Sequence, residues 1–266
     1  MYPFIHIGPL TLGTYGLMVA IGLICAFYLL RLDFTRRGIS ADAEAIIGIT
    51  GLAGLVGSRL YHLLESPAEF FADPLPQLFS TMGFAFVGAI IGGFIALVLL
   101  AKKFRMSPLL MLDAASPAAA IGYGIGRIGC LISGDGDYGR PTNLPWGMAF
   151  PHGIVPTTES CVEWGAPANC RVHPTPIYEF LVAILIFYIL WRLGERVINK
   201  RAPNGIIFAA YLVLTGVARF LVEIIRINPR SFFGMTNAQA ASVVSVVAGI
   251  ALFFYCRKAA PRNVRA

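Results

Sequence analysis

Apolar residues run through this chain in seven long stretches that are separated by shorter polar connections. As an α-helix, each stretch is long enough to cross the roughly 30 Å hydrocarbon core of a bilayer. The pattern therefore predicts seven transmembrane helices, near residues 12–30, 43–63, 83–101, 109–131, 176–193, 205–223 and 239–256.

The composition agrees with this interpretation. Hydrophobic residues make up 57% of the 266 positions and charged residues 13%, and the mean hydropathy is +0.71. Such a chain is too apolar for the surface of a soluble domain of this size. We predict an all-α, polytopic membrane protein in which residues 1–266 form a single integral membrane domain. The N-terminus lacks the basic residues and the cleavage site of a signal peptide, so the first apolar stretch is predicted to be a retained helix.

Basic residues lie in alternate connections. Fourteen of the 21 Lys and Arg residues gather there: Arg31, Arg36, Arg37, Lys102, Lys103, Arg105, Arg192, Arg196, Lys200, Arg201, Arg257, Lys258, Arg262 and Arg265. Cytoplasmic loops are enriched in such residues, so we predict that the N-terminus lies outside and the C-terminus in the cytoplasm. The net charge of +7 is then a topology signal, and no nucleic-acid partner is expected.

The opposite connections are different in character. Residues 65–80 carry Glu65, Glu69 and Asp73 but no Lys or Arg, and residues 133–175 form a long loop on the same outer side. This loop connects the fourth and fifth predicted helices. It holds Cys161 and Cys170, which could form a disulfide in an oxidising compartment, although spacing alone cannot show that the two sulfurs meet.

The most unusual stretch is Gly122–Arg140, which places Arg127 among closely spaced glycines at the end of the fourth apolar run. An arginine at membrane depth costs roughly 2.5–3.5 kcal/mol on insertion scales, so it needs a functional or pairing reason. The alternative is an arginine that extends its charged end to the interface.

Other polar residues reach the same depth, the outer third of the predicted membrane. They come from five predicted helices: Tyr15, Arg59, His62, Arg127, His173, Tyr178, Glu179, Arg219, Glu223 and Arg226. Each alone can be explained as an interfacial side chain or an ion pair within one helix. Together, four arginines on three helices indicate an anion site, and the simplest anion at this depth is a phospholipid phosphate.

Other chemistries lack support in the sequence. The four histidines show no ligand-like spacing with cysteine or carboxylate, so no metal is expected. Phosphate-binding loops, a nucleophile elbow and dinucleotide fingerprints are also missing from suitable strand-to-helix settings, so no cofactor is expected.

Several motifs resemble the prolipoprotein diacylglyceryl transferase family, in the same order over nearly the whole chain. They are Tyr15-Gly16-Leu17-Met18, Gly57-Ser58-Arg59, Gly88-Ala89-Ile90-Ile91-Gly92, Gly126-Arg127-Ile128-Gly129, Gly134-Asp135, Gly139-Arg140, His173-Pro174, Tyr178-Glu179, and Arg219 with Glu223 and Arg226. The resemblance implies an enzyme that moves the diacylglyceryl group of phosphatidylglycerol to the lipobox cysteine thiol of a preprolipoprotein, the first step of bacterial lipoprotein maturation.

The resemblance also implies roles for individual residues. Arg127 and Arg219 would hold the lipid phosphate and stabilise the leaving group. The lipid site would be completed by Tyr15, Arg59, Asp135, Gly139, Glu179, Glu223 and Arg226. Such enzymes lie in the inner membrane with a periplasmic N-terminus, and residues 133–175 would form a periplasmic cap that receives the acceptor peptide.

Two departures from the family pattern leave the general base open. The family has a histidine where this chain has Val87, and an asparagine where it has Cys130. His62, Tyr15, Glu179 and Asp135 are the candidates for accepting the thiol proton. A paralogue that uses the same lipid site on another acceptor is an alternative, and so is a transporter of lipid or small anions. A transporter would often show inverted repeats and a site at the midplane, neither of which this sequence indicates.

Overall fold

The computed structural model describes residues 2–65, 67–74, 76, 85–199, 202–231 and 233–259. Within these ranges seven helices are long and apolar enough to cross a membrane. They are α1 (Thr14–Arg37), α2 (Ala43–Glu65), α5 (Phe86–Lys103), α6 (Pro108–Ser133), α8 (Thr175–Asn199), α9 (Ile206–Ile225) and α10 (Asn237–Ala259). The prediction of an all-α, multi-pass membrane protein is confirmed. Part of the 65–80 connection and the predicted start of the third span, residues 83 and 84, lie outside the described residues.

The N-terminus corrects one boundary. A β-hairpin of strands β1 (Phe4–Ile7) and β2 (Leu10–Gly13) precedes α1, so the first helix begins at Thr14 and not at residue 12. The two strands are antiparallel and joined through Gly8, whose φ of +60° is readily available to glycine.

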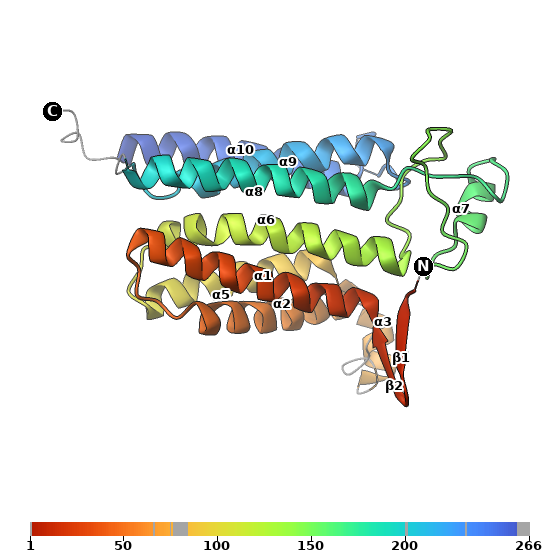
Figure 1. Cartoon of the computed structure of the whole chain (residues 1–266), viewed down its shortest axis with the longest axis horizontal. Helices are drawn as coiled ribbons and strands as arrows, with labels where there is room; N and C mark the ends of the chain where they lie inside the picture. The colour runs from red at the N-terminus through yellow and green to blue at the C-terminus, as the bar shows by residue number, and fades with distance from the viewer. Residues whose placement is uncertain are drawn as a thin grey trace. The chain divides into compact units, whose positions relative to one another are not determined.

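The chain divides into two compact units, residues 1–29 with 115–266 and residues 30–114. The expectation of a single domain stays a prediction. In the first unit α8, α9 and α10 run antiparallel and side by side (Figure 1). The α6 helix of this unit approaches α8 closely, because a methyl group at Gly124 would lie only 2.9 Å from the Cβ of Ala183.

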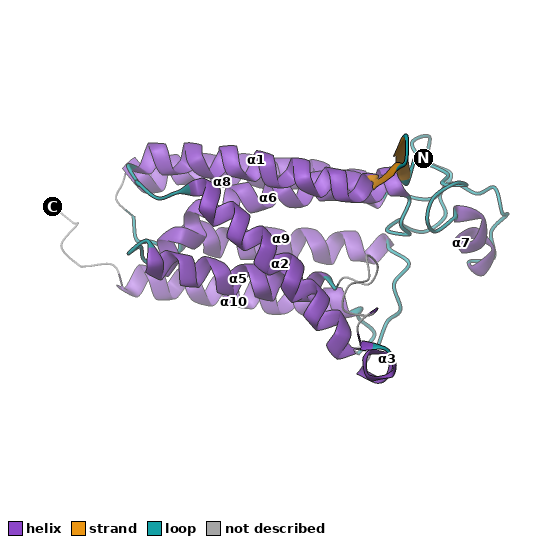
Figure 2. Ribbon diagram, turned by 90° about the horizontal axis from the view of Figure 1, so that it is seen from below, coloured by secondary structure: helices purple, strands orange, loops and turns teal. Residues whose placement is uncertain are grey.

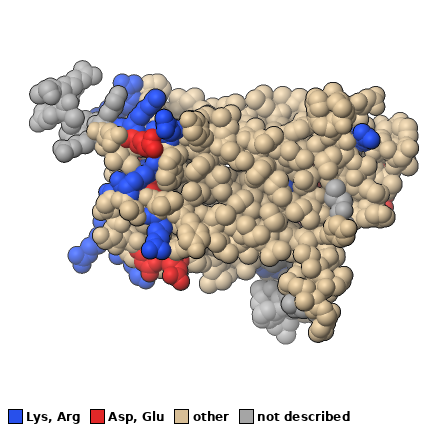
Figure 3. Space-filling model, in the orientation of Figure 1, with Lys and Arg blue, Asp and Glu red and all other residues tan. Residues whose placement is uncertain are grey.

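Basic residues mark one end of the antiparallel helices. Arg196 lies in the last turn of α8, and Arg257 and Lys258 lie in the last turn of α10. Figure 3 shows blue side chains at this end, whereas the sides of the helices are almost free of charge, as a bilayer requires. The predicted topology residues Lys200, Arg201, Arg262 and Arg265 lie outside the described residues.

The cap, residues 133–175, joins α6 to α8 through loops and one short helix, α7 (Thr157–Glu163) (Figure 2). In the small hydrophobic core of the cap, the ring of Tyr138 stacks on that of Phe150, with 4.4 Å between the ring centroids. Burial raises the pKa of Tyr138 to about 12. Cys161 and Cys170 form a disulfide, which confirms the pairing that the sequence had left open.

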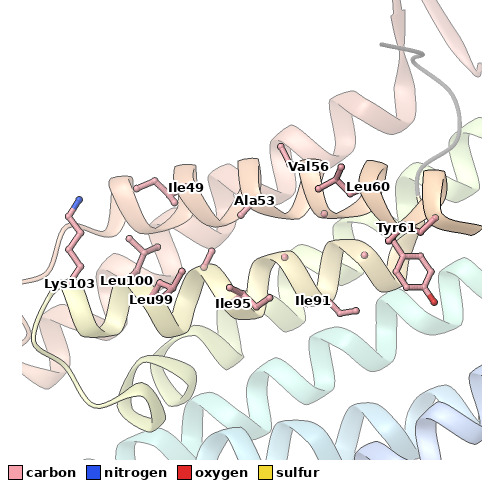
Figure 4. Close-up of a pocket in the computed structure, with 15 residues that line it drawn as sticks. Ile49, Ala53, Val56, Leu60, Tyr61, Ile91, Ile95, Leu99, Leu100 and Lys103 are labelled. Atoms are coloured by element: carbon pink, nitrogen blue, oxygen red, sulfur yellow. The ribbon is translucent and has the colours of Figure 1, made fainter. Parts of the chain in front are cut away.

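The second unit contains α2, α5 and the short helix α3 (Pro67–Ala72). The helices α2 and α5 cross at backbone contact, because a methyl group at Gly88 would collide with the carbonyl oxygen of Gly57. Beside this crossing runs an apolar groove of about 700 Å³, which has Tyr61 toward one end and Lys103 at the other (Figure 4).

Candidate active site

The end of α6 and the loop that follows it hold Arg127 in place. Its guanidinium lies over the ring of Tyr123, one helical turn earlier, at 4.9 Å from the ring centroid. Nη1 of Arg127 donates to Oδ2 of Asp137 and lies 3.8 Å from the Sγ of Cys130. With its side chain only 12% exposed, Arg127 is held inside the unit and does not reach outward to the interface.

Glu179, in the first turns of α8, is where the arginines converge. Its Oε1 accepts hydrogen bonds from the Tyr123 hydroxyl at 2.5 Å and from Arg219 Nη1 at 2.8 Å. Its Oε2 accepts from Arg226 Nη1 at 3.4 Å. The Nε of Arg127 lies 3.6 Å from Oε1. One buried carboxylate on α8 therefore faces guanidinium groups from α6, from α9 and from the residue that ends α9.

The end of α9 supplies a second buried carboxylate. Glu223 pairs with Arg219 Nη2 at 3.0 Å and accepts a hydrogen bond from the side-chain amide of Asn228. Arg226 ends the helix with extended backbone, and its Nη2 donates to Oδ1 of Asp137. Burial is the main reason that the pKa of Arg226 falls to about 10, with the charge of Arg127 adding to the effect. Arg226 therefore stays charged at neutral pH.

Backbone pairing fixes the loop against these helices. The N–H of Gly139 donates to the carbonyl of His173 at 2.9 Å, and the N–H of Arg140 donates to the carbonyl of Ile225 at 2.8 Å. A methyl group at Gly139 would lie 2.7 Å from the Ile225 carbonyl oxygen. Close packing thus explains the glycine at 139, and its part in lipid binding stays a prediction.

Asp135 lies at the edge of the arginine cluster. Its Oδ1 accepts the N–H of Asp137 at 3.2 Å, and a carboxylate oxygen lies within 4.8 Å of the Sγ of Cys130. Burial raises the pKa of Asp135, against the opposing effects of Cys130 and of two nearby arginines. Tyr15 is also at this edge, because a methyl group at Gly129 would lie 3.2 Å from its ring.

The ligand atoms of Cys130, Asp135 and Asp137 lie within 4.8 Å of one another, a grouping of the kind that can hold a metal ion. The carboxylate of Asp137, however, already accepts from Arg127 and Arg226. Two adjacent guanidinium groups repel a cation, so the donor set fits an ion-pair network better than a metal centre.

The structure brings most of the predicted site residues into one unit. Ion pairs connect Arg127, Glu179, Arg219, Glu223 and Arg226, and three more predicted residues lie on the same or adjoining segments: Tyr15, Asp135 and Gly139. Arg59 and His62 belong to α2 in the other unit, and their place in the site stays a prediction.

Two residues of the network were missed by the sequence analysis. Asp137 bridges Arg127 and Arg226, but in the sequence it follows Asp135 by two positions and could not be told apart from it. Tyr123 precedes Arg127 by four positions, a spacing that places the two on one helix face and that could have pointed to it.

The cluster combines three guanidinium groups with four carboxylates at the ends of helices that span a membrane. A guanidinium carries five N–H donors in a planar fork, so it can hold a carboxylate and a phosphate oxygen at the same time. Buried carboxylates hold the forks in fixed positions before a ligand arrives. The arrangement is suited to binding a phosphate ester at the edge of a bilayer.

Comparisons with known proteins agree with this chemistry. A family model described as "Prolipoprotein diacylglyceryl transferase" matches residues 3–255. The phosphatidylglycerol–prolipoprotein diacylglyceryl transferase of Clostridium tetani is 34% identical over 246 residues, which cover 90% of this chain and 91% of the relative. The enzyme of the same name from Chromohalobacter salexigens is 33% identical and covers 96% of this chain and 91% of its own length. The chain therefore belongs to the prolipoprotein diacylglyceryl transferase family.

Proposed function

We propose that this protein transfers the diacylglyceryl group of phosphatidylglycerol to the lipobox cysteine of preprolipoproteins. The observation that carries the proposal is the convergence of Arg127, Arg219 and Arg226 on the buried carboxylate of Glu179. Relatives that cover most of the chain bear the name of this activity, which supports the same donor and acceptor here.

Arg226 holds the loop against the end of α9, and Arg127 and Arg219 act on the phosphate of the lipid. These two arginines hold the phosphate in the bound lipid and stabilise the charge that grows on it as the carbon–oxygen bond to the diacylglyceryl group breaks. Because these donors are fixed and partly shielded from water, they stabilise that charge more strongly than mobile surface groups would. Tyr15 and Glu223 complete the lipid site in this proposal.

The orientation is part of the proposal. Basic residues at the ends of α8 and α10 favour a cytoplasmic position for those ends. The arginine cluster and the cap then lie on the periplasmic side of the inner membrane, and so does the N-terminus. A preprolipoprotein would present its cysteine to the cluster from this side.

Arg127→Lys tests the role of the guanidinium fork. The assay uses purified protein in phosphatidylglycerol-containing nanodiscs with a lipobox peptide, and mass spectrometry measures the thioether product. A lysine keeps the charge but not the two parallel hydrogen bonds, each worth about 1.5–3 kcal/mol when charged. We expect a loss of turnover of about ten- to a hundredfold.

The matched control is Arg192→Lys on α8, where the arginine side chain is 60% exposed. This variant should keep wild-type turnover. If Arg127→Lys also does so, the phosphate-clamp role is wrong. If the wild-type protein makes no thioether, and fails to rescue a strain depleted of its own transferase, the proposed activity itself is wrong.

A further inference from the structure

One carboxylate of the cluster differs from the other three. Asp137, Glu179 and Glu223 each form an ion pair with at least two arginines. Among the described residues, Asp135 forms no ion pair within 4.0 Å. A carboxylate that is held by two guanidinium groups is a weak base, since protonation would cost both pairs. Asp135 does not carry that penalty.

The surroundings of Asp135 also make it a better base than an aspartate in water. Burial is the largest influence and raises its pKa, which moves the group toward the range where proton transfer at neutral pH is efficient. The charged and titratable groups that act on it come from α1, α6, the loop and the end of α9. They are Tyr15, Arg127, Cys130, Asp137, Tyr138 and Arg226.

A thiol already lies close to this carboxylate. The Sγ of Cys130 and a carboxylate oxygen of Asp135 lie within 4.8 Å of each other, and the Sγ lies 3.8 Å from Arg127 Nη1. The site therefore brings a sulfur, a proton acceptor and a phosphate-binding guanidinium into one small space. A carboxylate accepts about four hydrogen bonds, so a second thiol can also reach it.

We propose that Asp135 is the catalytic base that removes the proton from the acceptor cysteine. The inference rests on the proposed function and answers the question raised by Val87, which stands where the family has a histidine. It assigns the proton to this aspartate rather than to His62, Tyr15 or Glu179.

The step balances in atoms and charge. The acceptor S–H proton passes to Asp135, and the thiolate forms a bond to the glycerol carbon that carries the phosphate ester. The bond between that carbon and oxygen breaks, and its electron pair leaves on glycerol phosphate, held by the arginines. The proton then passes from Asp135 to the departing phosphate, which restores the base.

The test compares a thiol with a selenol as the nucleophile. A selenol is already ionised at neutral pH, so a lipobox peptide with selenocysteine in place of cysteine needs no base. Wild type, Asp135→Asn and Asp135→Glu are assayed with both peptides in phosphatidylglycerol nanodiscs. With the cysteine peptide, Asp135→Asn should lose a hundred- to ten-thousandfold in turnover, the usual contribution of a general base. With the selenocysteine peptide it should stay within about tenfold of wild type.

Two further variants separate this role from others. Asp135→Glu keeps a carboxylate and should retain part of the thiol activity. Arg127→Lys should lose activity with both peptides, because ionising the nucleophile does not replace a phosphate ligand. Lipid binding by Asp135→Asn, measured by native mass spectrometry, should match that of wild type.

Several outcomes would overturn the inference. Equal losses with both peptides would mean that Asp135 only supports the structure, and an unchanged rate with the cysteine peptide would mean that it is not the base. Loss of only the thiol reaction in His62→Ala, with Asp135→Asn unaffected, would assign the role to His62. If Asp135→Asn does not fold, the test uses the wild type alone. The ratio of its turnover with the selenocysteine peptide to that with the cysteine peptide should rise more steeply, as the pH falls and Asp135 becomes protonated, than ionisation of the thiol alone explains. A rise that matches thiol ionisation alone would exclude Asp135 as the base. A wild type inactive with both peptides would instead refute the proposed function.

Discussion

Replacing Glu179 with glutamine tests whether the buried network holds the helices together. Glutamine has the same shape and can still accept from Tyr123, but it removes the negative charge that faces three arginines. The side chains of Glu179 and Arg226 are only 3% and 5% exposed, so water does not replace the lost partner. Breaking a buried ion pair by removing one partner costs about 3–5 kcal/mol. We take the lower end, about 3 kcal/mol, because Asp137 and Glu223 still neutralise part of the charge. That corresponds to roughly a hundredfold change in the unfolding equilibrium.

The assay is unfolding by SDS titration in mixed micelles, followed by circular dichroism. The matched control is Glu195→Gln, the same substitution further along α8. Glu195 pairs with Arg192 at 3.8 Å, and the two side chains are 45% and 60% exposed. An exposed pair of this kind contributes about 0–1 kcal/mol, so the control should unfold almost like wild type. A loss below about 1 kcal/mol for Glu179→Gln, or equal losses in both variants, would refute the argument from burial.

Two further predictions concern packing and the cap. Gly88→Leu should prevent α2 and α5 from crossing and should abolish the folded protein in detergent extracts. The control Gly93→Ala should be tolerated, since the nearest atom to a methyl group there is 3.6 Å away. A normal yield of Gly88→Leu in size-exclusion chromatography would contradict the prediction. Cys161→Ser opens a loop closed by residues nine apart and should destabilise the cap by about 2.5 kcal/mol. Limited proteolysis should then cut the cap faster than in wild type, and an unchanged rate would show that the core around Tyr138 alone holds it.

The helices were predictable because a segment that crosses the bilayer must be apolar over its whole length, and the hydropathy of the sequence shows such segments directly. All seven predicted spans coincide with helices, but α1 continues to Arg37, seven residues beyond the predicted end. The apolar pattern stops at the membrane surface, whereas the helix continues because Asp33 accepts hydrogen bonds from Arg36 and Arg37 one turn later. The β-hairpin was missed because its eight strand residues are as apolar as a helix start, and period alone does not separate short apolar runs.

The residue types of the site were predictable, but their pairing was not. Sequence placed Arg127, Glu179 and Arg219 at one depth, since depth follows from position along each span. Which carboxylate meets which arginine depends on how the loop after α6 turns. Its φ values of +63° at Gly134 and +91° at Gly136 direct Asp137 to the arginines and leave Asp135 beside Cys130. No periodic pattern carries that information.

Burial divides the arginines into two kinds. The side chain of Arg226 is 5% exposed, and its backbone pairs with Gly139, so it connects the loop to α9 whether or not a lipid is bound. The side chain of Arg219 is 26% exposed, more than those of Arg127 and Arg226. Both of its carboxylate partners are on helices, Glu179 on α8 and Glu223 on α9. A ligand phosphate can therefore reach Arg219 without breaking the contacts that hold the loop to α9. To reach Arg226, the phosphate would first require the loop to move. Arg226 thus holds the loop in place and Arg219 is open to the ligand. A rigid anion site needs both kinds of arginine, because the contacts that keep it rigid must not be broken when the ligand binds.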